Sequence, residues 1–416
     1  MNNRRLTFVI LLGALAVGCG SGNPDSTPAV KLPPDHTTFD VKWGDNTQVI
    51  DEASGKAHLM GAAPTADTLT YTFDHNASAI AALQAGQIAV LAGVAYRKVV
   101  SVTDTGTGYE LVTERTTLPE AMKSGTIDWS HAVDFGAPGS TTQAYAFGQP
   151  LGKKRQALDG AITYDGTIQG YKVSVTLTPT PGRLEISSNV SLDVLGEKRF
   201  AVTGTGFIQN FASQGRAVVG NGQLLEFQAG QTQVRGDLHV KAAAFNTGTN
   251  VQLLDVPLGI DIPMEVGPVP MVLKVKANIN VHLILSISAS SAEAEVTFHF
   301  STDQGIALSG TSLQTTGALH SGSLEGFAGG SADAAAAGMS TCLEFPRFEL
   351  SMLGEFASVG ISQNNCAQTD FTFDPACNEI YGTFTGIALA KLGFFGVTLA
   401  SGQVQLYTKT AGKRCQ

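Results

Sequence analysis

The sequence is short of charged and aromatic residues. Asp, Glu, Lys and Arg together make up 15% of its 416 residues, aromatic residues make up 7%, and tryptophan occurs twice. No basic run is longer than Lys153–Arg155, and the net charge is −9. Because nucleic-acid binding needs a basic surface that neutralises phosphates, we expect no nucleic-acid partner. Low charge combined with 47 glycines and many small and β-branched residues favours β-structure over helical bundles.

Local signatures of catalysis are missing as well. The sequence contains no G-x-S-x-G, no H-E-x-x-H and no Gly-rich phosphate loop followed by Lys-Ser/Thr. Ser130, His131 and Asp134 are close in the sequence, but a triad is assembled by the fold, so adjacency indicates little. Two carboxylates on separate strands, as in glycoside hydrolases, would leave no local pattern. We therefore assign no catalytic residue and no cofactor, and favour a protein that is not an enzyme.

The first eighteen residues have the pattern of a signal peptide. Arg4 and Arg5 precede the apolar run Leu6–Val17, which is too short to span a bilayer as a helix but suits the apolar region of a signal peptide. The tetrad Ala16-Val17-Gly18-Cys19 then resembles the lipobox of bacterial lipoproteins, although the usual first residue is leucine. The alternative is an ordinary secretory peptide cleaved nearby, with Cys19 incidental.

The lipobox resemblance implies a membrane anchor. In bacterial lipoproteins the cysteine corresponding to Cys19 is lipidated, with acyl chains such as palmitate, and becomes the mature N-terminus. Residue Gly20 is not the aspartate that favours inner-membrane retention in enteric bacteria. We therefore expect an exported protein, lipid-anchored at the cell envelope and more specifically at the outer membrane.

Composition divides the remaining chain into segments. Residues 19–36 are rich in Gly, Ser, Pro, Asn and Thr, which predicts a flexible tether. Residues 37–135 predict a small β-rich module with one short helix over Thr117–Gly125, and 136–155 predict a linker. Residues 156–416 predict a large antiparallel domain, either a β-sandwich or barrel-like, with long amphipathic strands. The expected fold class is therefore mainly β.

The clearest alternation lies in Val269–Ala289, where odd-numbered positions are apolar and even-numbered positions are mainly polar. Alternate residues of a strand share a face, so this segment predicts one long strand with one apolar face. Gly267 and Pro268 mark a kink or turn before it. If the protein carries an apolar ligand, the face that would line the cavity consists of Leu273, Val275, Ile279, Val281, Leu283, Leu285 and Ile287.

A second strand over Glu293–Phe300 is expected to fold back onto this long strand. The register that matches apolar with apolar residues places His282 opposite His299. Two such imidazoles are a weak candidate pair for a metal ion, and the plainer interpretation is two solvent-facing histidines. No metal site is assigned.

Four further cysteines lie near the C-terminus. Their even number in an exported protein predicts disulfides, and no C-x-x-C spacing suggests zinc. Of the three possible pairings, we favour Cys366 with Cys377 and Cys342 with Cys415.

Three functions remain open. The favoured one is a membrane-anchored lipoprotein with a non-catalytic binding or structural role and an unidentified protein, glycan or lipid partner. The alternatives are a carrier of a lipid or other apolar ligand in a β-lined cavity, and an exported hydrolase acting on glycans or lipids.

Overall fold

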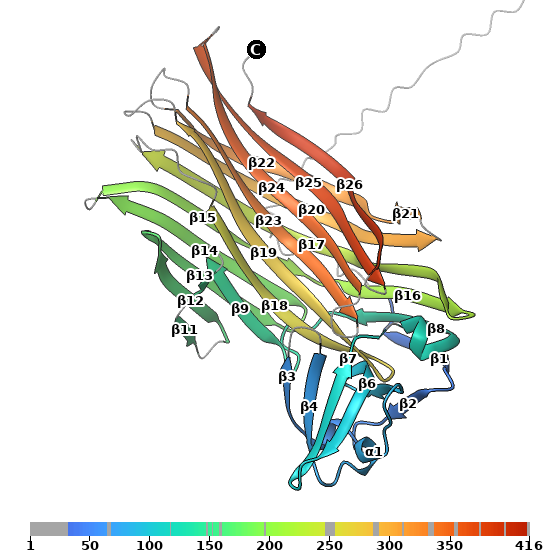
Figure 1. Cartoon of the computed structure of the whole chain (residues 1–416). Helices are drawn as coiled ribbons and strands as arrows, with labels where there is room; N and C mark the ends of the chain where they lie inside the picture. The colour runs from blue at the N-terminus through green and yellow to red at the C-terminus, as the bar shows by residue number, and fades with distance from the viewer. Residues whose placement is uncertain are drawn as a thin grey trace, which may run out of the picture. The chain divides into compact units, whose positions relative to one another are not determined.

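Almost all of the folded chain is β-strand (Figure 1). The computed structural model describes residues 32–64, 68–116, 118–146, 149–151, 153–157, 160–194, 197–245, 254–285, 291–309, 312–331, 337–352, 357–373, 376–394 and 397–413. In these ranges the strands form three sheets, and helix is limited to η1 (Lys56–His58), α1 (Ser78–Ala81) and α2 (Leu118–Ala121). The prediction of a mainly β protein with large antiparallel sheets is confirmed.

The smallest sheet has six strands in the order β2-β5-β6-β7-β4-β3. All of its pairings are antiparallel except that of β2 with β5. Its apolar side chains form a core of their own, which includes Phe73, Ile80 and Leu111. The strands are β2 (Thr47–Ile50), β3 (Leu59–Pro64), β4 (Thr68–Asp74), β5 (Ile88–Leu91), β6 (Ala95–Asp104) and β7 (Gly108–Glu114).

The largest sheet is antiparallel and is organised around β17. One edge of β17 pairs first with β16 and then with β15, and its other edge pairs with β20. The strands are β1 (His36–Trp43), β8 (Met122–Ala132), β11 (Lys153–Gln156), β12 (Ile162–Ile168), β13 (Tyr171–Thr180), β14 (Arg183–Val194), β15 (Glu197–Gln209), β16 (Ala212–Gly220), β17 (Gln223–Phe245), β20 (Ser291–Ser309), β21 (Ser312–Thr315) and β22 (Ala318–Ser331).

The third sheet is also antiparallel, in the order β10-β9-β18-β19-β23-β24-β25-β26. Gly267 and Pro268 form the two-residue turn between β18 and β19, where Val266 pairs with Val269. This confirms the turn expected there. The strands are β9 (Thr141–Ala146), β10 (Gln149–Pro150), β18 (Leu254–Val266), β19 (Val269–Leu285), β23 (Ala337–Met352), β24 (Ala357–Phe373), β25 (Ala376–Phe394) and β26 (Val397–Lys413).

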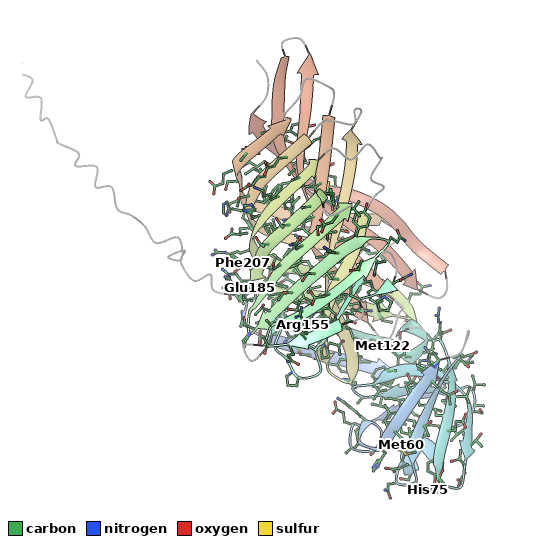
Figure 2. All side chains as sticks on the ribbon, turned by 90° about the vertical axis from the view of Figure 1, so that its left-hand side faces the viewer. Met60, His75, Met122, Arg155, Glu185 and Phe207 are labelled. Carbon is green, nitrogen blue, oxygen red and sulfur yellow. A yellow bond between two sulfur atoms is a disulfide. The ribbon has the colours of Figure 1, made fainter. Side chains whose placement is uncertain are left out.

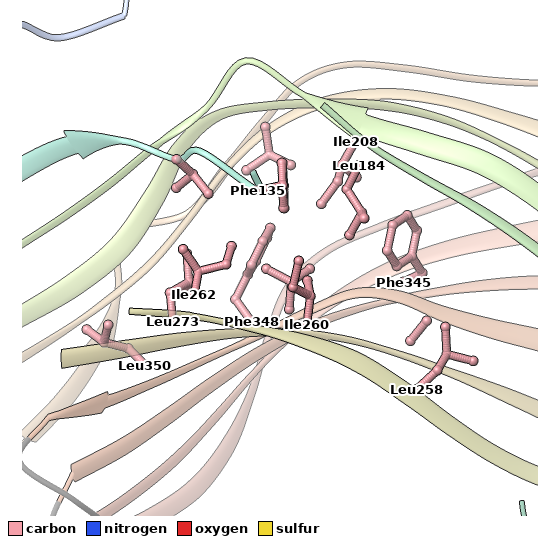
Figure 3. Close-up of a cluster of buried hydrophobic side chains, with 14 of the residues drawn as sticks. Phe135, Leu184, Ile208, Leu258, Ile260, Ile262, Leu273, Phe345, Phe348 and Leu350 are labelled. Atoms are coloured by element: carbon pink, nitrogen blue, oxygen red, sulfur yellow. The ribbon is translucent and has the colours of Figure 1, made fainter. Parts of the chain in front are cut away.

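The two large sheets pack face to face around one apolar core. Phe300 of β20 lies 5.8 Å from Phe384 of β25 between ring centres, and Phe211 lies 5.1 Å from Phe348 of β23. In β19, for example, every second side chain from Val269 to Ala277 lies in this core, as expected for a sheet buried on one face. Figure 3 shows part of the core, with Leu184, Ile208, Leu258, Ile260, Ile262, Leu273, Phe345, Phe348 and Leu350 drawn from both sheets.

Segment boundaries differ from those expected. Strands β1 and β8, placed in the small module by sequence, belong to the largest sheet. The supposed linker 136–155 contains β9, β10 and the start of β11. Its Gly and Pro content was misleading because an edge strand tolerates proline, and Pro150 lies on the edge strand β10. The expected helix over Thr117–Gly125 is limited to α2, and β8 begins at Met122.

The predicted hairpin between Val269–Ala289 and Glu293–Phe300 is wrong. Strand β19 pairs with β18 and β23, whereas β20 pairs with β17 and β22 in the opposite sheet. Apolar faces match across the interior of stacked sheets as well as along a hairpin. Matching apolar residues therefore could not decide between the two arrangements.

Candidate functional site

The sequence-predicted ligands and cavity residues do not come together. His282 pairs with Ser340, while His299 lies opposite Asp237 and Ser323 in the other large sheet. Within the described ranges, no three His, Cys, Asp or Glu residues are grouped as they would be around a metal ion.

The described part of the predicted apolar ligand face is packed against protein. Leu273 and Val275 are 0% and 1% exposed and belong to the core. The side chains of Ile279, Val281, Leu283 and Leu285, and residue Ile287, lie outside the described part of the structure. The structure therefore assigns Leu273 and Val275 to the core between the sheets.

The predicted cysteine pairing is corrected. Cys342 of β23 and Cys366 of β24 are direct neighbours in the ladder, and they form the disulfide with their Cα atoms 4.0 Å apart. Cys377 lies at the far end of the next hairpin, opposite Thr372, while Cys366 lies opposite Thr383. Cys415 and Cys19 lie outside the described residues. Long-range register therefore determined a pairing that the cysteine spacing did not indicate.

A polar cleft of about 300 Å³ opens on the outer face of the largest sheet. One row of paired positions crosses it, because Ser130 pairs with both His36 and Gln214, and Gly230 pairs with both Gln214 and Gly305. Directly paired residues point to the same side of a sheet, so this row faces the cleft. The site is therefore assembled from β1, β8, β16, β17 and β20.

Two glycines form the floor of the cleft. A Cβ atom on Gly230 would overlap the carbonyl oxygen of Gln304, and one on Gly305 would overlap the Thr316 hydroxyl. Neither position can therefore carry a side chain without a shift of its neighbours. Isolated glycines inside strands are a sequence signal for close approach of this kind, and this signal was present but not used.

Two hydroxyl groups at the cleft have no hydrogen-bond partner. Ser130 is 2% exposed, and neither its Oγ nor the Oγ1 of Thr232 makes a hydrogen bond. A buried hydroxyl without a partner costs about 1–3 kcal/mol, so such groups usually bind water or a ligand. The cleft therefore offers polar atoms that the protein itself does not satisfy.

The charged groups of the cleft are paired with one another. Asp128 lies between His36, at 2.7 Å, and Arg216, at 3.4 Å, and Arg216 also lies 3.6 Å from Glu226. The hydrogen bond with Asp128 raises the pKa of His36. On the opposite wall, Asp303 accepts a hydrogen bond from the Gln233 backbone at 2.7 Å and contacts His320 at 2.8 Å.

This geometry does not form a nucleophile–base pair. His36 Nε2 contacts Asp128, and the Ser130 hydroxyl has no hydrogen-bond partner. The Ser130, His131 and Asp134 side chains, which are close in the sequence, do not come together either. His131 contacts Thr37 at 2.9 Å, and Asp134 caps a turn at Gly136. The arrangement suits binding better than acyl transfer, which needs the base on the nucleophile.

Comparison with protein-family models, with curated proteins and with solved structures finds no match to this chain. Among the residues that the structure describes, there is no helix with the length and apolar character needed to cross a membrane.

His299 is part of a separate charged group on the same sheet. Its Nδ1 lies 2.6 Å from Asp237 and its Nε2 lies 2.5 Å from Glu325. Burial lowers the pKa of His299, but the hydrogen bonds to Asp237 and Glu325 and their charges outweigh it, so the pKa is raised. Both ring nitrogens can donate only in the protonated imidazole.

We predict that His299 stabilises the fold at mildly acidic pH. Since its folded pKa is above the unfolded value of about 6.5, its contribution is complete below that value and is lost as the pH rises through the folded pKa. The difference in unfolding free energy between the wild type and His299→Gln should be larger at pH 6 than at pH 9. We expect it to stay below about 1 kcal/mol, as for exposed ion pairs. Urea unfolding of the wild type and the variant measures this difference in free energy. His75→Gln is the control, because the His75 ring packs on Tyr109. A difference that grows towards pH 9 would contradict the prediction.

Proposed function

We propose that this protein is an exported lipoprotein, anchored at the cell envelope through Cys19, that binds a ligand in the polar cleft without transforming it. The observation that carries the binding role is the pair of hydroxyls on Ser130 and Thr232, which have no partner in a hollow floored by glycine. The leader and the Gly-, Ser- and Pro-rich composition of the segment after it support the envelope location, because a linker of that composition lets a folded binding domain reach partners near the membrane.

The cleft favours binding over the two alternatives. A carrier of apolar molecules needs an unfilled apolar lumen, whereas the described part of the face assigned to it is packed in the core. A hydrolase needs a base placed on a nucleophile or two suitably separated carboxylates. Asp128 and Asp303 of the cleft are instead each held by cationic or backbone groups of the protein.

Native mass spectrometry of the protein purified from its own membranes tests the binding role. We expect a bound mass that is lost on denaturation and is absent from the variant Gln228→Trp, in which an indole fills the cleft from an exposed position of β17. Gln223→Trp changes the same residue type on the same strand outside the cleft, and should keep the bound mass. A bound mass retained by Gln228→Trp would place the ligand elsewhere and contradict the proposal.

A further inference from the structure

We infer that the cleft binds an uncharged ligand rich in hydroxyl groups, of the size of a short glycan. This inference rests on the proposed function and adds the chemical class of the ligand. It follows from the side-chain atoms without a hydrogen-bond partner among the cleft residues, which all belong to uncharged residues and include the hydroxyls of Ser130 and Thr232.

The carboxylates of the cleft already have partners in the protein before any ligand enters. Asp128 is shared by His36 and Arg216, and Asp303 is held by His320 and a backbone N–H. An anionic or cationic ligand would have to displace one of these partners to gain its own. An uncharged ligand leaves all of them in place, which avoids exposing a charge that has lost its partner.

The unsatisfied atoms call for groups that both donate and accept. The hydroxyls of Ser130 and Thr232 each have one proton to donate and lone pairs to accept. Ligand hydroxyls match this two-way capacity, and the amide of Gln214, in the same row as Ser130, adds further donors and an acceptor. The cleft volume of about 300 Å³ is at the lower end of the range for small-ligand sites, which suits one or two sugar rings of a short glycan.

Three trisaccharides of different charge test this inference on the lipid-anchored protein, held in a detergent without sugar groups. Chitotriose is neutral, the fully deacetylated chitosan trimer is cationic and trigalacturonic acid is anionic. Calorimetric titration should show the tightest binding for chitotriose.

Ser130→Ala, which removes only one oxygen, should weaken the binding of chitotriose at least fivefold, and Thr232→Val should weaken it as well. Arg183→Ala is the control. Arg183 lies 2.8 Å from Glu185 on the same face of the largest sheet but outside the cleft. Figure 2 labels Glu185 and its neighbour Phe207 in this region.

Each outcome decides the inference. Tighter binding of either charged trimer, no binding of any trimer, or equal affinity of Ser130→Ala and the wild type would overturn it. If the trimers fail while Gln228→Trp still removes a bound mass, the ligand class is wrong and the proposed function stands. If Gln228→Trp also keeps the bound mass, both are wrong.

Discussion

Replacing Cys19 by serine is expected to move the protein from the membrane pellet to the soluble fraction. The lipobox resemblance implies that this thiol is the site of acylation. Each buried CH₂ of an acyl chain contributes about 0.8 kcal/mol of membrane affinity, and one chain alone binds only reversibly. A multiply acylated cysteine therefore anchors a domain firmly, and loss of the thiol should release nearly all of the protein.

Fractionation of cells and labelling with a palmitate analogue measure the effect. Ser21→Ala, two residues further on in the tether, should leave both the labelling and the membrane fraction unchanged. If Cys19→Ser remained in the pellet after a high-salt wash, the anchor would lie elsewhere. If it stayed soluble but the wild type carried no label, the leader would be an ordinary secretory peptide.

The second large effect is expected at the disulfide between Cys342 and Cys366. The bond closes a loop with a sequence separation of 24 residues. By the loop-entropy relation, a loop of this size corresponds to about 3.5 kcal/mol of stability. Cys342→Ser should therefore lower the free energy of unfolding by about that amount, and Cys366→Ser should have the same effect because either change removes the same bond.

Guanidinium unfolding with and without reductant checks this prediction. Reductant should destabilise the wild type and have no comparable effect on a Cys342→Ser/Cys366→Ser double variant. Cys377→Ser is the matched control and should retain the Cys342–Cys366 linkage in a peptide map. A map linking Cys366 to Cys377 would restore the pairing favoured by sequence and refute the one in the structure.

Much of the local structure followed from the sequence. Alternation in Val269–Ala277 correctly indicated a strand with one buried face, and Met271, Leu273, Val275 and Ala277 are at most 2% exposed. Gly267 and Pro268 correctly indicated a turn. These features depend on backbone geometry over a few residues, where side chains alternate and glycine permits a positive φ, here 61°.

The candidate site was not visible at that level. Ser130, Arg216, Gly230 and Gly305 come from strands separated by many residues. The sequence singled out Ser130 only for its neighbours His131 and Asp134, which the fold directs to other partners. The glycines within the strands were a signal that went unused. They indicated that another group lies close to the backbone, but not which group it is.

The sequence by itself determined that alternate side chains of β19 are buried, that a turn lies at Gly267 and Pro268 and that β-structure dominates. These properties follow from the two-residue period of a strand, from local turn chemistry and from composition. Only the tertiary structure decided that β19 and β20 lie in opposite sheets, that Cys342 meets Cys366, and that Gly230 and Gly305 leave a polar hollow between β1 and β20. Pairing between distant strands depends on the packing of the whole chain. Many registers bury the same apolar faces, and the choice among them is made by contacts that no short segment contains.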